Sequence, residues 1–506
     1  MACLIGIDVG TTNCKAAAYS ESGILKAMAS RPTITHYLEN NWAEFNPDQI
    51  WEAIQGSLKD IIKQLSGEKI DGIAVASMGS AGVLLTENDE WINRSIAWFD
   101  TRTESIAEWW NDTMGREQVY EITGFAPNPI AGITKVQWIR DNKPNQFKKV
   151  KHWLSMQDYI VYRLTGEAVV DFSVACRTMA VDLKNRCWSK DILDHARIPE
   201  EICSKLKKPG ELAGKVTKKA SELTDIAEGT LVYTGGMDYV CGAFACGLVE
   251  SGQVLSAIGT SEQILMVTDE PANKIEHIDT NFTCVNYVVN DKYYIQGQLI
   301  SSGVIMDWFH TEVAREDLST LIQEAEKSPL GAKGVLLLPY FRGKYAPGAD
   351  SRAKGAFVGL TTSHTRGDLA RAILEGLCYE SKVIINGLQE VTGNEVKEVN
   401  VIGGATKSQF WMQMKADILG IPVRCIDESE AVTLGVAMLA GIGAGVYKDS
   451  ADAVFKTRRE TKIYTPDFKK HEKYNTIFEN VYKNIFPALK EMNYKIDDMI
   501  KLGGIV

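Results

Sequence analysis

The sequence lacks any long hydrophobic run. Its 506 residues include no stretch that approaches the roughly 18 to 20 apolar residues of a membrane-spanning helix. The apolar segment 4–7 is short and ends at Asp8, so it is not typical of a signal peptide. We therefore expect a cytoplasmic protein that makes no contact with a membrane.

Closely paired cysteines and an excess of basic residues are absent as well. The ten cysteines are scattered, and the close pair Cys241 and Cys246 lacks the two-residue spacing of zinc and thioredoxin motifs. Reduced thiols agree with a cytoplasmic location. Lysine and arginine total 55 against 65 acidic residues, a net charge of −10, so no basic stripe is available to bind nucleic acid.

Two common nucleotide-binding motifs are also missing. No Gly-Lys-Ser/Thr follows a glycine at the spacing of a Walker P-loop. The cluster Gly441, Gly443 and Gly445 follows a predicted helix instead of a strand, which favours a helix-terminating turn over a Rossmann motif. Any nucleotide site in this chain must therefore use a different loop.

The composition is that of an ordinary globular protein, with 45% hydrophobic and 24% charged residues. A chain of this length is too long for one core and is most simply divided into two domains of roughly 250 residues. We place the division at residues 1–246 and 247–506.

The most informative stretch is 4–15, where a short apolar strand carries a carboxylate, Asp8, close to its end. Gly10, Thr11 and Thr12 follow with a flexible turn, backbone N–H groups and two hydroxyls, and Lys15 opens a second apolar run. Burying a carboxylate is costly unless a cation or donors meet it. The pattern predicts a phosphate-binding hairpin in which Asp8 holds Mg²⁺ through water. An ordinary hairpin with a solvated Asp8 is the alternative.

Polar residues follow two further predicted strands. The strand 72–76 ends in a run of small residues that includes Gly79 and Ser80, where a ligand can approach the backbone. The strand 95–99 ends in Asp100 and Arg102 beside aromatic residues, a combination that suits a polyhydroxyl compound. An Asp100–Arg102 ion pair that caps the next helix is the alternative.

The middle of the chain contributes a third candidate site. The irregular stretch 166–219, with Arg177 among its polar residues, fits an inserted lobe that lines a cleft. An apolar strand at 231–234 then runs through two glycines into Asp238, just before a predicted helix. Asp238 could act as general base for a hydroxyl nucleophile, or it could simply cap the helix.

The opening pattern recurs in the second half. Residues 253–265 again form strand, Gly-Thr-Ser turn and strand, without the Asp and Lys. Such a repeat suggests two related domains that face each other across a cleft, with phosphates between the two turns. The strand, glycine turn and helix from 401 onward would allow close approach of adenine or ribose.

These segments, in this order, resemble the FGGY family of carbohydrate kinases, and the resemblance, closest to xylulose kinase-like members, covers nearly the whole chain. The most specific match is 355–360 with its continuation through His364 and 368–375, together with the upstream segments 338–341 and 346–347. The resemblance implies an α/β fold of two actin-like (ribonuclease H-like) ATPase domains facing each other across a cleft. It also implies transfer of the ATP γ-phosphoryl group to a hydroxyl of a sugar or polyol.

Family roles are carried over by matching positions. Asp238 matches the catalytic base and Asp8 the carboxylate near Mg²⁺. The residues that match the ATP-binding loops are Thr11, Thr12, Lys15, Gly259, Thr260, Gly303, Gly404, Ala405 and Ser408. The first half would then bind the sugar and supply the base, and the second half would bind the nucleotide.

The substrate pocket departs from the best-known members. Gly79 and Ser80 stand where xylulose kinases have Met-His and glycerol kinases have Arg-Glu, and the usual aromatic near Lys135 is replaced by residues 130–132. We expect a less crowded pocket that takes a ketose, a sugar acid or a polyol other than glycerol, with pentulose-like and hexulose-like acceptors favoured. The expected contacts are Gly79, Ser80, Asp100, Arg102 and Asp238.

Two other functions stay open at this point. One is an actin-like or Hsp70-like ATPase that acts on a protein partner, and the other is a sugar-binding regulator with weak kinase activity. The sequence also leaves open the sugar, the hydroxyl that is phosphorylated, allosteric control and the oligomeric state, for which a homodimer is one expectation.

Overall fold

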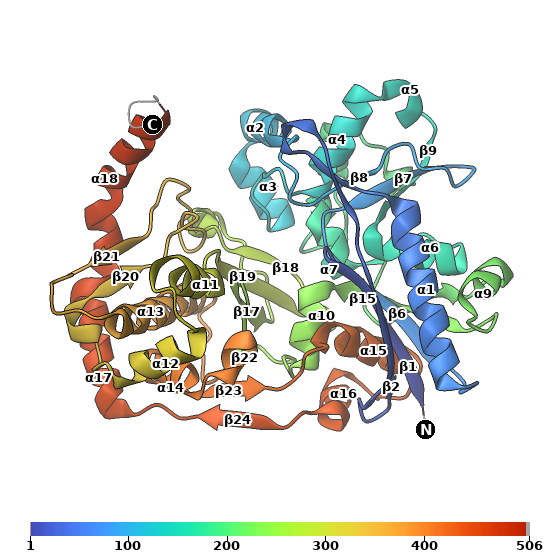
Figure 1. The fold of residues 1–506 in the computed structure, drawn as a ribbon. Coiled ribbons are helices and arrows are strands. Elements are labelled where there is room, and N and C mark those ends of the chain that lie inside the picture. Colours follow the sequence, from blue (N-terminus) through green and yellow to red (C-terminus); the bar gives the residue numbers. More distant parts are fainter. Residues whose placement is uncertain (1, 502–506) are drawn as a thin grey trace.

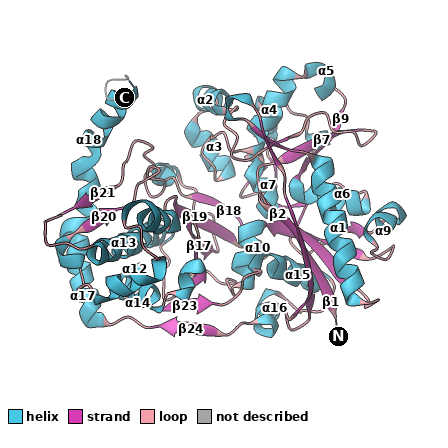
Figure 2. Ribbon diagram, viewed as in Figure 1, coloured by secondary structure: helices cyan, strands magenta, loops and turns pink. Residues whose placement is uncertain are grey.

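The computed structural model describes residues 2–501; Met1 and residues 502–506, at the outer ends of the two predicted domains, lie outside the described part. Each half of the chain builds an α/β unit around its own sheet, and the two units stand side by side (Figure 1). Helices cover both sheets, as the colouring in Figure 2 shows.

The first sheet has the strand order β14-β15-β6-β1-β2-β3. The neighbours β1, β6 and β15 run parallel, and the other pairs are antiparallel. The residues of β1 are buried, as expected for a central strand covered on both faces, except Asp8, which is half-buried and has one fully buried carboxylate oxygen. The bounds are β1 (Cys3–Val9), β2 (Asn13–Ser20), β3 (Leu25–Pro32), β6 (Gly72–Ser77), β14 (Leu212–Lys215) and β15 (Leu231–Met237).

The second sheet has the order β18-β19-β17-β16-β22-β23-β24. Here β16, β22 and β23 run parallel, and the remaining pairs are antiparallel. The bounds are β16 (Val254–Ile258), β17 (Glu262–Thr268), β18 (Thr283–Asn286), β19 (Tyr293–Leu299), β22 (Val399–Gly403), β23 (Val423–Ile426) and β24 (Thr461–Tyr464).

The two sheets repeat one topology. In each, an antiparallel hairpin, β1-β2 or β16-β17, lies beside parallel strands, β6 and β15 or β22 and β23, and an antiparallel strand closes that side. The strand β18 extends the second sheet beyond this common pattern. The predicted duplication of the α/β fold is thereby confirmed.

In the first half of the chain, the first helix, α1, starts after Asn46, whose side chain caps it by accepting from the Asp48 N–H. The helices of this half are α1 (Pro47–Leu65), α2 (Glu104–Thr113), α3 (Arg116–Thr123), α4 (Gly132–Asn142), α5 (Pro144–Phe147), α6 (Met156–Thr165), α7 (Phe172–Ala175), α8 (Lys190–His195), α9 (Lys218–Thr224) and α10 (Asp238–Ala245). Short strands complete this half: β4 (Thr35–Tyr37), β5 (Ala43–Phe45), β7 (Gly82–Thr86), β8 (Ser95–Ile96), β9 (Val150–Ser155), β10 (Val169–Asp171), β11 (Val181–Asp182), β12 (Cys187–Trp188) and β13 (Lys205–Lys207).

In the second half, the long helix α13 is almost entirely buried along its length and packs on β17, β19 and β20. The helices are α11 (Gly303–Trp308), α12 (Leu318–Lys327), α13 (Arg366–Thr392), α14 (Gln409–Leu419), α15 (Ala431–Gly443), α16 (Ser450–Thr457), α17 (Phe468–Ile477) and α18 (Lys483–Lys501), with the short strands β20 (Leu336–Leu338) and β21 (Ala356–Val358). Within residues 2–501, no helix has both the length and the hydropathy that a membrane crossing requires.

One helix of the second half crosses to the first sheet. The helix α15 packs against β1, β6, β15 and α10, and Figure 1 shows α10 and α15 between the two sheets. Both helices approach closely because small residues face each other: a Cβ on Gly435 would lie 1.9 Å from the carbonyl oxygen of Cys241. The sequence predicts that three clustered glycines follow a helix, but Gly441 and Gly443 lie in the last turn of α15 and only Gly445, at φ +73°, lies beyond it.

One predicted strand is much shorter than expected. The strand predicted at 95–99 is only β8 (Ser95–Ile96), and the chain turns directly afterwards, with the Asp100 N–H donating to the Ala97 carbonyl at 3.1 Å. The turn forms because the Asp100 carboxylate accepts from the backbone N–H of Ala43 and of Arg102, which draws the chain back.

Candidate active site

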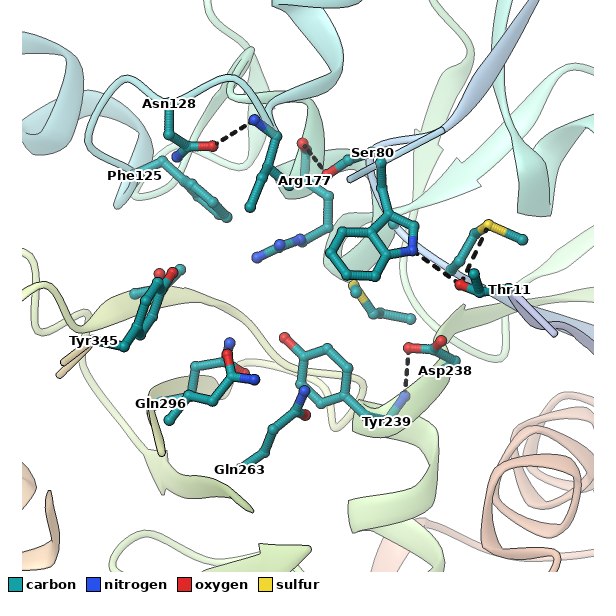
Figure 3. Close-up of a pocket in the computed structure, with 17 residues that line it drawn as sticks. Thr11, Ser80, Phe125, Asn128, Arg177, Asp238, Tyr239, Gln263, Gln296 and Tyr345 are labelled. Carbon is teal, nitrogen blue, oxygen red and sulfur yellow. Dashed lines mark hydrogen bonds between the residues drawn. The ribbon is translucent and has the colours of Figure 1, made fainter. Parts of the chain in front are cut away.

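A cavity of about 190 Å³ lies between the two halves of the chain. Its walls come from the carboxyl edge of the first sheet, from loops and short helices of the first half, and from β17, β18 and β19 of the second sheet. Figure 3 shows the labelled side chains converging on this space. It is lined by Thr11, Met78, Gly79, Ser80, Trp98, Phe125, Asn128, Ile130, Arg177, Met237, Asp238, Tyr239, Gln263, Thr283, Gln296, Gln298 and Tyr345.

Strand register brings the predicted catalytic and metal-binding carboxylates to one sheet edge. Asp8 of β1 lies opposite Ala76 of β6, and Met237 of β15 lies opposite the next residue, Ser77. Asp238 follows as the first residue of α10. Burial raises the pKa of Asp8 well above its ordinary value, and the charge of the nearby Asp238 adds to the rise.

Asp238 faces the cavity, and one of its carboxylate oxygens accepts a hydrogen bond from the Tyr239 N–H at 2.7 Å. It is the first helical residue of α10, while Met237 occupies the N-cap position, so the capping alternative is not realised. Burial raises the pKa of Asp238 to about 6, against the opposing effects of the Tyr239 N–H and of Arg177. A carboxylate with this pKa is ionised at pH 7 and is well matched to accepting a proton.

Hydrogen bonds hold the turn of residues 10–12, which the sequence predicts to bind phosphate. The Gly10 N–H donates to the Asn13 carbonyl at 3.0 Å, and Thr12 is exposed at the tip. The Thr11 hydroxyl accepts from the indole N–H of Trp98 at 2.9 Å, which joins the turn to the wall of the cavity.

Lys15 lies directly opposite Asp8 in the β1-β2 hairpin. Its ammonium pairs with Glu430, at the start of α15, with an Nζ to Oε2 distance of 2.8 Å. Both side chains keep some solvent exposure, 28% for Lys15 and 16% for Glu430. In this structure, therefore, Lys15 bridges the first hairpin to the helix that crosses from the second half.

The turn at Gly259 and Thr260, the second turn predicted to bind phosphate, packs against the start of α11. The N–H of Gly303 donates to the Gly259 carbonyl at 3.0 Å, and the N–H of Ser302 donates to the Thr260 carbonyl at 2.9 Å. A Cβ on Gly303 would lie 2.6 Å from that Gly259 oxygen. Only glycine fits the close contact between these two predicted ATP-binding segments.

Parallel register places Gly404 and Ala405, which the sequence predicts to bind the nucleotide, beside the second turn. Gly403, the last residue of β22, lies opposite Ile258, so Gly404 and Ala405 begin next to Gly259. Gly404 is exposed and faces open space, and the Ser408 hydroxyl caps α14 by accepting from the Trp411 N–H at 3.3 Å. The predicted ATP-binding residues of the second half thus share one edge of the second sheet.

The predicted substrate contacts Asp100 and Arg102 do not line the cavity. They form a buried ion pair with each other, at 2.8 Å, and Arg102 also pairs with Glu44 at 2.9 Å. Although burial alone would raise the pKa of Asp100, hydrogen bonds from Arg102 and Ala43 lower it below the ordinary value. The structure therefore forms the ion pair of the alternative but not its helix cap, because α2 starts without a side-chain cap. The Arg102 guanidinium carbon lies 4.3 Å from the centroid of the Trp42 ring.

Gly79 and Ser80 do line the cavity, but the room beside Gly79 is not empty. A Cβ at this position would lie 2.7 Å from the Cγ of Arg177 and 2.9 Å from the Sδ and Cε of Met237. The Ser80 hydroxyl donates to the Arg177 carbonyl at 3.2 Å. The expected gain in open space at Gly79 is therefore absent: the side chains of Arg177 and Met237 fill it.

Sequence reasoning did not assign the rest of the wall. Arg177, from a 3₁₀ turn at Cys176–Thr178, points into the middle of the cavity (Figure 3). Gln263, Gln296 and Gln298 reach it from alternate positions of the neighbouring strands β17 and β19. The period-two placement of glutamines on these strands was the available signal, but it gained meaning only once the two halves were placed together.

A Mg²⁺ ion fits the Asp8 side of this site. One carboxylate oxygen of Asp8 is buried and has no hydrogen-bond partner, which is an open ligand position. Within residues 2–501, no three His, Cys, Asp or Glu side chains form a metal cage. Mg²⁺ commonly uses one or two carboxylates together with substrate phosphates and water, so Asp8 suits it.

Comparisons with known proteins agree with this architecture. Residues 3–245 match the FGGY family of carbohydrate kinases, N-terminal domain, and residues 254–444 match its C-terminal domain. Xylulose kinase from Bacillus subtilis (strain 168) is 30% identical over 493 residues, which cover 97% of this chain and 98% of that protein.

Two crystal structures from Lactobacillus acidophilus superpose on nearly the whole chain. A ligand-bound xylulose kinase matches with a TM-score of 0.90 and 27% identity, covering 98% of this chain and 100% of that one. A gluconate kinase matches with the same TM-score and identity, covering 98% and 99%. The chain therefore belongs to the FGGY family of carbohydrate kinases, phosphotransferases that use ATP together with Mg²⁺.

Proposed function

We propose that this protein phosphorylates one hydroxyl of a sugar, sugar acid or polyol, with Asp238 as the general base. The observation that carries this proposal is the position of Asp238: its carboxylate faces a cavity between the two halves, beside Asp8 and the first phosphate turn. Its pKa, raised by burial to about 6, suits proton transfer at neutral pH.

In this proposal, different residues of the chain accept the proton, hold the phosphates and bind the metal ion. Asp238 accepts the proton of the acceptor hydroxyl while that oxygen bonds to the γ-phosphorus and the bond from phosphorus to the departing ADP oxygen breaks. The N–H groups and hydroxyls of Thr11 and Thr12, and the turn at Gly259 and Thr260, hold the phosphates from opposite sides. Asp8 would hold Mg²⁺, which when bound neutralises phosphate charge.

We further propose that residues 1–246 carry sugar binding and the base, and residues 247–506 the nucleotide pocket. Support comes from Gly259, Gly303 and Gly404, which gather at one edge of the second sheet. The second half also contributes glutamines to the cavity wall, so the acceptor would contact both halves.

The acceptor is proposed to differ from glycerol and D-xylulose, with other pentulose-like and hexulose-like chains favoured. The residues behind this expectation are Gly79 and Ser80, which stand where those kinases carry larger pairs, and the Arg177 side chain that fills the space at Gly79. A polar wall built for one pattern of hydroxyls disfavours an acceptor that leaves its groups unpaired.

The rival functions fit the geometry less well. An ATPase that acts on a protein partner has no need of a carboxylate on the floor of a small cavity between the domains, and Asp238 lies there. A sugar-binding regulator would not need Asp8 and Asp238 as neighbouring ionisable groups.

The test is an ADP-release screen with Mg-ATP over ketopentoses, ketohexoses, tetritols, aldonic acids, glycerol and D-xylulose. We expect ADP release that depends on one class of acceptor and is lost in Asp238→Asn. ADP release that no acceptor stimulates, and that Asp238→Asn leaves unchanged, would refute the kinase assignment.

A further inference from the structure

The cavity contains an arginine, Arg177, that forms no ion pair with the described residues 2–501. The Arg177 guanidinium lies over the ring of Phe125, with its carbon 4.6 Å from the ring centroid. Its Nε is buried without a hydrogen-bond acceptor, and within residues 2–501 no acidic side chain lies within 4.0 Å of the guanidinium. The rest of the guanidinium faces the cavity, where a bound anion could pair with it once the ligand displaces the water there.

Two other arginines of the same chain have guanidinium groups whose charge and hydrogen-bond donors are both paired. Arg102 pairs with Asp100 and Glu44, and its side chain is 1% exposed. Arg371 pairs with Glu375 at 2.7 Å and also donates to a tyrosine hydroxyl and to a backbone carbonyl. Arg177 differs from both because its guanidinium faces the cavity instead of a carboxylate of the chain.

The charged residues that line the cavity also favour an anionic acceptor. Among the described residues that line it, Arg177 is the one cation and Asp238 the one carboxylate. The two are not ion-paired, and Asp238 must stay free to take the proton of the reacting hydroxyl. A neutral acceptor would displace water from Arg177 and return no charge to it, whereas a carboxylate on the acceptor would pair with the planar guanidinium through two hydrogen bonds.

We propose that the acceptor is a sugar acid whose carboxylate binds Arg177 while one of its hydroxyls lies against Asp238. This inference rests on the proposed kinase function. Among the acceptor classes proposed there, it selects the sugar acid over the neutral pentulose-like and hexulose-like sugars. Gln263, Gln296 and Gln298 would bind the remaining hydroxyls, and one amide oxygen, Oε1 of Gln296, is buried without a donor. The likeness to both a xylulose kinase and a gluconate kinase leaves the charge of the acceptor open, so the argument stands on Arg177.

The first experiment uses the unmodified protein with Mg-ATP and pairs of acceptors that differ only at one end. D-Gluconate is compared with D-glucitol, and D-xylonate with xylitol, with D-xylulose as a neutral ketose. At least one aldonate should exceed its matched alditol in kcat/KM by about 30-fold or more, the scale of a buried charge pair. Turnover of alditols or ketoses with no gain for any aldonate overturns this inference and leaves the kinase function standing.

The second experiment removes the guanidinium. Arg177→Met should lower kcat/KM for the aldonate about 30-fold more than for the alditol, mostly through KM, and Arg177→Lys should recover part of the loss. The matched control is Arg186→Met, which removes an arginine that pairs with Asp291 outside the cavity and should keep the aldonate-to-alditol ratio.

A binding measurement completes the test. The aldonate should raise the melting temperature of the unmodified protein and of the Arg186→Met control, and should not raise that of Arg177→Met. If Arg177→Met does not fold, Arg177→Lys and the acceptor pairs decide. An equal fall in kcat for every acceptor and for acceptor-free ATP hydrolysis would assign Arg177 to the phosphoryl group and overturn the inference. No ADP release with any acceptor would overturn the kinase function and this inference with it.

Discussion

The hairpins β1-β2 and β16-β17, both predicted to bind phosphate, have the same backbone arrangement but place their charged side chains differently. In β1-β2 the facing pair just before the turn region is Asp8 and Lys15, and the corresponding pair in β16-β17 is Ala257 and Gln263. The first hairpin places the Asp8 carboxylate beside the site, and one of its oxygens accepts no hydrogen bond. The second keeps its acid, Glu262, turned inward.

Glu262 is buried in the core of the second half, where it forms an ion pair and hydrogen bonds. Its side chain and that of Lys415 are each 1% exposed and lie 2.5 Å apart, and the hydroxyls of Ser256 and Ser381 also donate to it. A duplicated fold can therefore use one hairpin for chemistry and the other for rigidity. The four predictions that follow separate these two roles, beginning with the base that the first sheet presents.

Asp238→Asn should have the largest effect on activity. Losing a general base lowers kcat by about 100-fold to 10⁴-fold. Because burial raises the pKa of Asp238 to about 6, kcat/KM of the unmodified enzyme should fall tenfold per unit as the pH drops below that value. The raised pKa also means that the charged form costs folding stability at neutral pH, so the neutral amide should not lower the melting temperature. Turnover equal to that of the unmodified enzyme would refute the assignment.

Glu262→Gln should act on stability instead. Removing one partner of a buried ion pair leaves the other charge unpaired, which costs about 3 to 5 kcal/mol in the free energy of unfolding. The double variant with Lys415→Met should regain part of that loss in urea denaturation. Glu430→Gln is the matched control, because its pair with Lys15 is partly exposed and should contribute about 1 kcal/mol or less. Equal losses for both pairs would contradict the division of roles.

Asp8→Asn tests the first hairpin directly. Through-water metal ligands typically contribute about 10-fold to 100-fold in metal affinity or activity, so the Mg²⁺ concentration for half-maximal rate should rise by that factor. Burial holds the pKa of Asp8 well above its ordinary value, which destabilises the ionised fold, and the variant should therefore melt at the same or a higher temperature. An unchanged Mg²⁺ dependence would remove Asp8 from the metal site.

Much of this architecture could be predicted from local sequence. The hairpin around Asp8 and the strand and helix around Asp238 each depend on residues close together in the chain, so apolar periodicity and turn residues sufficed. The repeat of the hairpin at Gly259 predicted the duplicated topology that the two sheets display.

The wall of the cavity could not be predicted in the same way. Arg177 and Gln296 come from elements more than a hundred residues apart, and only the packing of the two halves places them in one cavity. Asp100 and Arg102 have the hydrogen-bonding groups that a sugar contact needs. In the structure they instead bind each other, and Glu44 and the Ala43 N–H add further contacts to this buried pair. Which of two partners a charged side chain meets is decided by tertiary structure.

Trp98→Phe should have the smallest effect, and it probes the link between the cavity and the first turn. The indole N–H of Trp98 donates to the Thr11 hydroxyl at 2.9 Å, and the ring also lines the cavity. Phenylalanine keeps an aromatic face but loses this one hydrogen bond, which is worth about 0.5 to 1.5 kcal/mol, or up to about tenfold. If the bond positions the phosphate turn, KM for ATP should rise by a few-fold, and Thr11→Val should give a similar change that does not add to it in the double variant. A rise confined to KM for the acceptor would instead mean that Trp98 serves only the sugar, and that the first turn keeps its shape without help from the cavity wall.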